Sequence, residues 1–480
     1  MKSNLFFHKH KDIILFSLVF SILIVLTGNI PFFWTMGYFG SLATRFYESN
    51  FTQLIFNIDN GAPPLYGIYI AFLWKVFGKS LMVFHLAALP FIIGILIQLK
   101  KLTKALFPEI NTYVLFFLLL FEPTFITICS LGGYDLCITF FFFYAMNVIY
   151  FHKKNFFFLL SILIITFLNL RGFTIVFGIF LFDVYIQIRN KKRENTIRGK
   201  ILFILPYFIC LLAFIGWLRY HYSILGWHIV HPDFDSFHKL NHLEMLIRNF
   251  IYIFWKIFDF GRFIIWVPLI FILLKFLFQK KLFNKENTAY VYFLFTLLYY
   301  FIFYLVNSYP VSHRYFLLSY IISLVLFLSL INKISNKIHQ TLLILVSCIV
   351  LFFGNFIIYP ERFGNGWDAS LKYLPYFSLK QNIDNYIILQ NIKPEEVGAH
   401  YPMNFDNYDT DLSETHFKYA ALNNDHFKNY KYIILSNISN SFSPQVMEEI
   451  ENKWSLEKEF KSYQIYIKLY KNPNTTHELN

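Results

Sequence analysis

The sequence predicts an all-α polytopic membrane protein with a small α/β domain at its C-terminal end. Of its 480 residues, 56% are hydrophobic and only 15% are charged, whereas soluble domains carry about 25% charged residues. The apolar residues gather in runs close to the roughly 20 residues that a helix needs to cross a bilayer. After residue 358 charged residues become frequent again. This composition excludes a soluble enzyme, a coiled coil and a disordered chain.

Eleven apolar runs are predicted to span the membrane. They cover approximately residues 12–30, 81–99, 112–131, 135–151, 155–171, 172–188, 200–218, 262–279, 288–306, 314–332 and 340–358. The end of the last run divides the chain into a predicted transmembrane domain, 1–358, and a predicted extracytoplasmic domain, 359–480.

The positions of the basic residues predict how the chain is oriented. Lys and Arg form short clusters between the apolar runs, which is the pattern of cytoplasmic loops that obey the positive-inside rule. We therefore expect a cytoplasmic N-terminus, an extracytoplasmic C-terminal domain and a location in the bacterial cytoplasmic membrane. The net charge of +13 is not gathered on one continuous face, so we expect no nucleic-acid partner.

Segments outside the predicted spans also have recognisable patterns. The first outer loop, 31–80, contains the apolar stretch Leu65–Phe77, which is too short to span and is predicted to lie along the membrane interface as a helix, as is Phe250–Phe258. In the C-terminal domain, 432–435 and 465–469 are predicted as strands and Pro444–Trp454 as a helix.

Ionisable residues close to a membrane face are candidates for function, because placing them there is costly. Asp59 and Asp135 each end an outer loop where an apolar stretch begins, so either could act as a base beside a lipid-borne substrate; alternatively, Asp135 only caps the helix that follows it. Glu122 lies inside an apolar run. It is either a buried partner for an arginine such as Arg171 or a neutral acid.

Arg171 and Arg314 carry positive charge at the same face. A guanidinium binds phosphate bidentately, so both are candidates to hold a lipid phosphate; the alternative is that they only extend toward the membrane interface. The His- and Asp-rich loop 228–244 has spacings that fit no rigid pair of metal ligands, and we assign it no metal.

An ordered set of short motifs resembles the C-type (GT-C) membrane glycosyltransferases, which include the protein mannosyltransferases and the lipid A aminoarabinose transferases. The resemblance covers roughly residues 1–330. The motifs are Phe33-Trp34-Thr35, Phe46-Tyr47-Glu48, Asp59-Asn60-Gly61-Ala62-Pro63-Pro64-Leu65-Tyr66, Tyr134-Asp135, Leu170-Arg171-Gly172 and Tyr309-Pro310-Val311-Ser312-His313-Arg314-Tyr315.

The resemblance implies transfer of a sugar, with inversion, from a polyprenyl-phosphate donor to a lipid, glycan or protein acceptor on the outer face. It implies a first-loop carboxylate that acts as base or holds a divalent cation, a second-loop carboxylate that assists, and basic residues that bind the lipid phosphate. We predict Asp59 as the base, Asp135 as its support and Glu48 in reserve. The predicted substrate-binding residues are Arg171, His313, Arg314, Tyr66 and Arg45.

The sequence departs from the family pattern at two positions. Thr35 stands where the family usually has its first-loop acid, and Ala62 stands where a histidine usually precedes the two prolines. Two other functions therefore stay open. One is a transporter or flippase of lipid-linked saccharides, and the other is a non-catalytic relative that binds a glycolipid.

Overall fold

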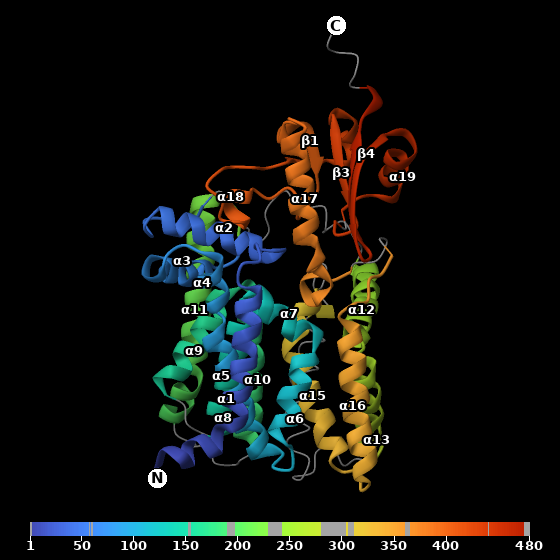
Figure 1. Cartoon of the computed structure of the whole chain (residues 1–480). Coiled ribbons are helices and arrows are strands. Elements are labelled where there is room, and N and C mark those ends of the chain that lie inside the picture. The colour runs from blue at the N-terminus through green and yellow to red at the C-terminus, as the bar shows by residue number, and fades with distance from the viewer. Residues whose placement is uncertain are drawn as a thin grey trace.

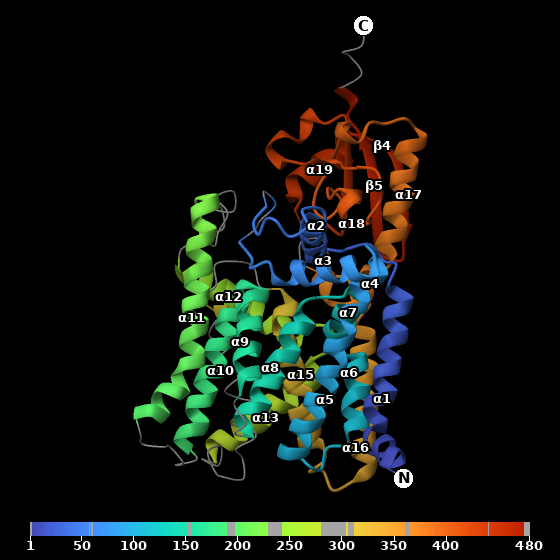
Figure 2. The ribbon, with the colours of Figure 1, turned by 90° about the vertical axis from the view of Figure 1, so that its left-hand side faces the viewer.

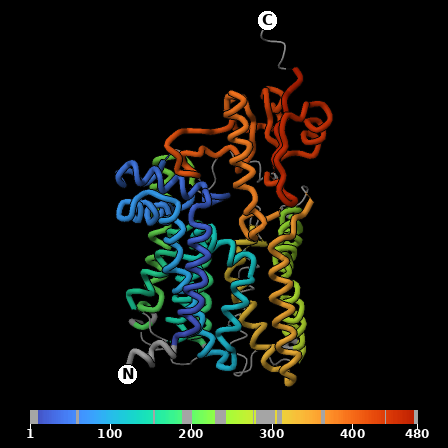
Figure 3. The backbone as a smooth tube through the Cα atoms, viewed as in Figure 1, coloured from blue at the N-terminus to red at the C-terminus, as the bar shows by residue number. Residues whose placement is uncertain are grey.

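The computed structural model describes residues 2–56, 58, 61–151, 155–189, 197–228, 242–279, 304–305, 312–360, 365–439 and 441–474. Long helices lie side by side in a bundle, and a small sheet with its own helices stands at one end of it, which we call the sheet end (Figure 1). The first helix rises from the end of the bundle that lies opposite the sheet (Figure 3). The predicted fold class is confirmed.

The helices of the bundle follow the predicted spans. Each predicted span except 288–306 coincides with a helix or a pair of helices, and that run lies outside the described residues apart from 304–305. The bounds are α1 (Lys2–Thr27), α5 (Leu89–Leu106), α6 (Thr112–Phe121), α7 (Pro123–Leu131), α8 (Asp135–Tyr150), α9 (Phe156–Leu168), α10 (Leu170–Arg189), α11 (Ile197–Leu225), α12 (His242–Phe258), α13 (Phe263–Phe278), α15 (Leu317–Ile331) and α16 (Lys337–Gly354).

The number of full-length spans is smaller than eleven in the described part of the chain. Six helices there are long and apolar enough to cross a membrane, or up to eight if each of two bent pairs is one span. The helices α8 and α9, with 16 and 13 residues, fall short of that length.

The two bent pairs change direction at polar residues. Between α6 and α7 the bend is 73°, where Pro123 lacks a backbone N–H and disfavours the helical conformation of Glu122 before it. The Glu122 carboxylate then accepts a hydrogen bond of 2.6 Å from the Phe125 N–H and caps α7. Between α12 and α13 the bend is 111°, with Gly261 at φ +79°. Both bends bring polar side chains into the bundle.

The first outer loop forms three helices, α2 (Thr35–Glu48), α3 (Leu65–Phe77) and α4 (Leu81–Leu86). Turned by 90°, the molecule shows α3 lying across the sheet end of the bundle (Figure 2). Its bounds are those predicted for an interfacial helix. The other predicted interfacial stretch, Phe250–Phe258, forms the second half of α12.

The C-terminal sheet has five strands in the order β2-β1-β3-β5-β4. The strands β1 (Val397–Ala399), β2 (Ala420–Ala421) and β3 (Tyr432–Ser436) are parallel, whereas β5 (Ile465–Lys471) runs antiparallel to β3 and β4 (Ser455–Ser462). The two predicted strands match β3 and β5, and the predicted helix matches α19 (Pro444–Lys453). The helix α17 (Pro375–Leu389), which packs on β4 and β5, was not predicted. The domain boundary at 358/359 stays a prediction.

The C-terminal region also contacts the first outer loop. A short helix, α18 (Asn407–Thr410), lies against α2. Arg45 forms an ion pair of 3.3 Å with Asp409, and the Phe32 N–H donates a hydrogen bond of 2.9 Å to the Thr410 carbonyl. These contacts hold the C-terminal region over the sheet end of the bundle.

Candidate functional site

A small cavity lies at the sheet end, where the first outer loop, the start of α8 and the C-terminal region meet. Its polar lining consists of Thr35, Asp135, Arg314 and Asp368. The apolar lining consists of Phe33, Met36, Ile128 and Leu131, and Gly133 also lines the cavity. Its volume of about 10 Å³ is that of roughly one water molecule.

Asp135 is placed by the turn that precedes it. Gly132, at φ +64°, ends α7, and that conformation is easily adopted only by glycine. The Tyr66 hydroxyl donates a hydrogen bond to the Gly132 carbonyl, which fixes the turn. Asp135 is then the first residue of α8, where its side chain makes no capping hydrogen bond. The capping role considered for Asp135 is therefore wrong in this structure.

The carboxylate of Asp135 instead pairs with Arg171. The Arg171 guanidinium lies 2.9 Å from Asp135 Oδ1 and donates a hydrogen bond of 2.5 Å to the Tyr134 hydroxyl. It also lies over the Tyr315 ring, 3.9 Å from the ring centroid. An arginine held in this way does not extend to the membrane interface, so the alternative for Arg171 is wrong. The two residues that the sequence singled out on separate loops are brought together.

Arg314 and Asp368 form the other half of the polar lining. The Arg314 Nε lies 3.2 Å from Asp368 Oδ2, without the alignment of a hydrogen bond, and the Ser312 hydroxyl donates to Asp368 Oδ1 at 3.4 Å. Burial raises the pKa of Asp368 above its ordinary value; Arg314 opposes that rise and Asp135 adds to it. Within the described chain, Asp135 Oδ2 and Asp368 Oδ2 accept no hydrogen bond. The cavity therefore contains carboxylate oxygens that are available to a ligand.

A loop of the C-terminal region covers the cavity. Tyr401 lies near Thr35, and its ring packs edge-on against Trp34 with centroids 4.8 Å apart. Asp368 belongs to the adjacent turn Trp367–Ala369, whose Ala369 carbonyl accepts a hydrogen bond of 3.2 Å from Thr124 in α7. Two separate parts of the C-terminal region thus complete the site.

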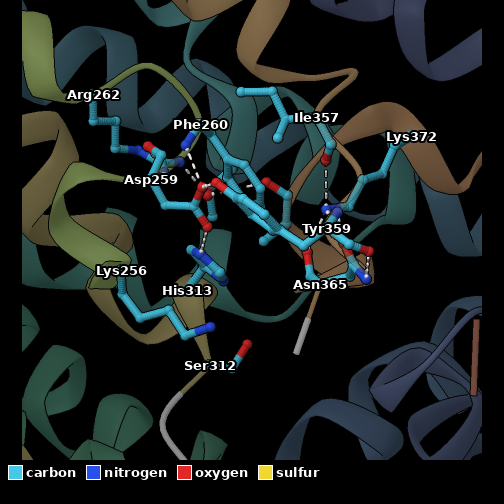
Figure 4. A network of polar contacts seen from close by, with 12 residues as sticks. Lys256, Asp259, Phe260, Arg262, Ser312, His313, Ile357, Tyr359, Asn365 and Lys372 are labelled. Atoms are coloured by element: carbon cyan, nitrogen blue, oxygen red, sulfur yellow. Dashed lines mark hydrogen bonds and ion pairs between the residues drawn. The ribbon is translucent and has the colours of Figure 1, made fainter. Parts of the chain in front are cut away.

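A second polar cluster lies beside the cavity, centred on Asp259 (Figure 4). His313 Nε2 lies 2.6 Å from Asp259 Oδ2, and the Phe260 N–H donates to Oδ1 at 2.7 Å. The Tyr359 hydroxyl donates to the same Oδ1. His313, predicted to bind substrate, therefore contacts Asp259 and does not line the cavity.

Two further basic residues extend this cluster. Lys372 donates hydrogen bonds to the Ile357 carbonyl, at 3.0 Å, and to the Asn365 carbonyl. Arg262 pairs with Glu122, its Nε lying 2.7 Å from Oε1. Glu122 thus has an arginine partner, as one of the two predictions required, but the partner is Arg262 and not Arg171.

Lys256 differs from the other buried cations of the region. Its residue is 7% exposed, and its ammonium lies 4.5 Å from the centroid of the Trp255 ring. Among the described residues the ammonium makes no hydrogen bond or ion pair, although its charge acts on both Asp259 and Asp368. In Figure 4 it points toward Ser312 and His313. A buried charge without a partner is costly, so this position suits an anionic ligand.

The remaining predicted site residues lie elsewhere. Glu48 and Arg45 are toward the far end of α2 from Thr35, about 20 Å and about 15 Å along the helix at about 1.5 Å per residue. There Glu48 accepts a hydrogen bond from Tyr408 and pairs with Arg45 at 3.4 Å. Neither residue lines the cavity. Asp59 and most of the loop 228–244 lie outside the described residues.

Sequence reasoning missed Asp368, Tyr401, Asp259 and Lys256. One signal could have found Asp368: it is an ionisable residue shortly after the last apolar run, and the same criterion had selected Asp135. As for metals, no group of three or more His, Cys, Asp or Glu side chains in the described chain is arranged to hold an ion. The expectation of a divalent cation thus continues to rest on the resemblance.

The fold is similar to that of a solved membrane protein. No family model and no curated protein matches the sequence. ArnT from Cupriavidus metallidurans, whose crystal structure is bound to undecaprenyl phosphate, superimposes with a TM-score of 0.53 over 96% of this chain and 98% of that chain, at 9% sequence identity. The chain has a GT-C-like fold. This agrees with the resemblance to the lipid A aminoarabinose transferases. At 9% sequence identity the likeness is one of fold.

Proposed function

We propose that the chain is an integral-membrane glycosyltransferase that moves a sugar from a polyprenyl-phosphate donor to an acceptor on the outer face of the membrane. The observation that carries the proposal is the cavity, where Asp135 and Asp368 each have a carboxylate oxygen that accepts no hydrogen bond within the described chain, beside Arg171 and Arg314. The GT-C-like fold supports it, since ArnT is bound to a polyprenyl phosphate. We further propose that the sheet end faces outward and the N-terminus lies in the cytoplasm, as the basic clusters predict.

Lys256 and Arg314 are the proposed contacts of the donor phosphate. Both are buried, and both act electrostatically on Asp368. The phosphate gains negative charge as its bond to the sugar breaks. Fixed cations beside the phosphate therefore stabilise the transition state more than they stabilise the bound donor. Arg171 is already paired with Asp135 and positions that carboxylate, with its remaining N–H groups directed to the sugar or phosphate.

Asp368 is the proposed base. A base must lie within reach of the proton that it removes and is most effective when its pKa approaches the working pH. Asp368 lines the cavity, and burial raises its pKa in the direction that the second requirement asks for. Asp135 is held in the ion pair with Arg171 and supports the reaction. The role predicted for Asp59 stays a prediction.

The reaction then follows from these positions. An acceptor hydroxyl gives its proton to Asp368, and its oxygen forms a bond to the anomeric carbon. The bond from that carbon to the phosphate oxygen breaks on the opposite side, which inverts the configuration. The electron pair stays on the phosphate, held by Lys256 and Arg314.

Entry of the substrates requires movement of the cover. A cavity of about 10 Å³ has room for a water molecule and not for a sugar. The part that we propose must move is the turn with Asp368, because it belongs to the C-terminal region and lines the cavity opposite the first outer loop and α8. Closure after binding would then exclude water from the reaction.

A non-catalytic glycolipid-binding protein is the second candidate. Thr35 favours it, because this residue faces the cavity where the family usually has an acid, and a threonine hydroxyl is no base near neutral pH.

Transfer of a labelled sugar from polyprenyl-phosphate donors, measured in membranes that contain the chain, separates the two functions. Asp59→Asn, Glu48→Gln, Asp135→Asn and Asp368→Asn are compared with the wild type. We expect turnover by the wild type, strong loss with Asp368→Asn and little loss with Glu48→Gln. If the wild type binds the donor but transfers no sugar, the second candidate is correct.

A further inference from the structure

A larger cleft lies on another side of the C-terminal region. It is formed between residues 358–360, which leave the last helix of the bundle, and the turn that joins β4 to β5. Its volume is about 630 Å³, within the range of small-molecule binding sites. We infer that this cleft binds the saccharide part of the acceptor, an inference that rests on the proposed function.

The walls of the cleft have the chemistry that sugars need. Three tyrosines line it, Tyr359, Tyr463 and Tyr466, together with Lys461 and Gln464. Aromatic rings pack against the C–H faces of sugar rings, while amide and ammonium groups donate hydrogen bonds to sugar hydroxyls. A lipid chain would leave these donors without partners, whereas a saccharide would pair them.

The side chains at the rim are available to a ligand. Among the described residues, the side chains of Lys461, Tyr463 and Gln464 make no hydrogen bond or ion pair. The turn that presents them is nevertheless fixed, because the Asn437 amide donates to the Gln464 carbonyl at 2.7 Å and accepts from the Tyr466 N–H at 3.2 Å. The cleft thus has a rigid frame and unpaired polar groups, as a preformed binding site does.

Tyr463 gives an independent indication. It has φ +59° and its residue is 70% exposed. A two-residue turn between strands usually has glycine or asparagine where φ is positive, and a bulky residue there is rare. Backbone strain of this kind gathers at ligand-binding sites. The strain places an aromatic ring at the mouth of the cleft, where folding alone has no use for it.

One residue connects the cleft to the cavity. Tyr359 lines the cleft and donates its hydroxyl hydrogen bond to Asp259. Asp259 also binds His313, and the next residue, Arg314, lines the cavity. Tyr359 therefore links the cleft, through Asp259 and His313, to the segment that contributes Arg314 to the cavity. This arrangement suits an acceptor that is longer than one sugar.

The test is direct binding by the full-length chain in lipid nanodiscs. Wild-type protein is applied to an array of oligosaccharides from bacterial envelopes, and the strongest binder is titrated by fluorescence. We expect Tyr463→Gly, which removes the ring and relieves the strain, to weaken binding at least tenfold, and Lys461→Gln to weaken it severalfold. Lys458→Gln, a change of an exposed lysine on the same strand outside the cleft, is the matched control and should bind as the wild type does.

Failure of this inference differs from failure of the proposed function. If no oligosaccharide binds, or if Tyr463→Gly binds as tightly as the wild type, the cleft is not a saccharide site. Binding to phosphatidylglycerol vesicles without saccharide is measured as well. If Tyr463→Gly weakens that binding as much as it weakens saccharide binding, the cleft contacts the membrane surface and the inference is overturned. If saccharide binding needs Tyr463 but no donor supports transfer, the proposed function fails and the saccharide site stands.

Discussion

His313 and Arg314 are neighbours in the chain, yet they belong to two polar clusters that differ in how far their groups are paired. His313 joins the Asp259 cluster, where both carboxylate oxygens of Asp259 accept hydrogen bonds or pair with the imidazole. Arg314 lines the cavity, where Asp368 leaves one oxygen without a hydrogen bond in the described chain. The same segment thus contributes one residue to a carboxylate whose two oxygens are both paired, and the next residue to a carboxylate with one oxygen that accepts no hydrogen bond in the described chain.

The difference indicates what each cluster does. A buried carboxylate with both oxygens paired stabilises one arrangement of the chain, and Asp259 here ties the break between α12 and α13 to the segment that follows α16. Unpaired buried groups cost free energy, and they persist where a ligand completes them. We therefore assign the Asp259 cluster to support and the Asp135–Asp368 cavity to chemistry. Each prediction below tests that division.

The largest effect is expected for the proposed base. Asp368→Asn should reduce sugar transfer at least about 100-fold, the usual size of a general-base contribution. Its thermal stability should not fall. A carboxyl group whose pKa is raised by folding contributes most to stability at low pH, and that contribution is lost as the pH rises through the raised pKa. At neutral pH asparagine removes the cost of the buried charge. A lower melting temperature with unchanged transfer would reverse the assignment.

Lys256→Gln should have the second-largest effect on sugar transfer. Removal of a charged hydrogen bond to the donor phosphate costs about 1.5–3 kcal/mol, which corresponds to a loss of roughly 10- to 100-fold in donor use. The loss should appear in titrations of donor and not of acceptor. Lys428→Gln, at an exposed lysine of the C-terminal sheet region, is the control. Equal donor use by both variants would show that Lys256 has no ligand.

Arg171→Lys is expected to have a smaller effect, about 1–3 kcal/mol on transfer. Lysine keeps the charge but loses the planar group that reaches Tyr134 and Asp135 and lies over Tyr315. The measurement is the rate of transfer at saturating donor and at low donor. A lysine variant with the wild-type rate at both would exclude a role for the guanidinium.

Asp259→Asn should affect stability more than chemistry. It weakens the pairing with His313 and Tyr359, for which we expect a loss of about 1–3 kcal/mol in the free energy of unfolding. Transfer, measured well below the melting temperature, should change only severalfold. If this variant lost transfer as completely as Asp368→Asn while keeping its stability, the division between support and chemistry would be wrong.

Much of the fold follows from local pattern, and the site only in part. Hydropathy predicts the helices because each span is a local property of about 20 residues, and short runs rich in isoleucine and tyrosine predict β3 and β5. Asp135 and Arg171 are recognisable as charges beside short outer turns. Their pairing, by contrast, depends on the packing of α8 against α10, which no local pattern encodes.

The missed residues have a common cause. Asp368 follows the last span in a segment that resembles a linker, and Lys256 lies in a stretch whose pattern predicts an interfacial helix. Their roles arise only when the C-terminal region folds back over the bundle and the chain bends by 111° after α12. Both are tertiary events that join distant segments.

The central claim is that a carboxylate in the covered cavity acts as the base, and a rescue experiment tests it most directly. Thr35 lines the same cavity as Asp368, so an acid placed there faces the same substrate. Sugar transfer from a polyprenyl-phosphate donor is measured for the wild type, Asp368→Asn, and Asp368→Asn combined with Thr35→Asp. The account predicts that the single variant loses transfer and that the double variant regains at least part of it. Unchanged transfer by Asp368→Asn would contradict the account.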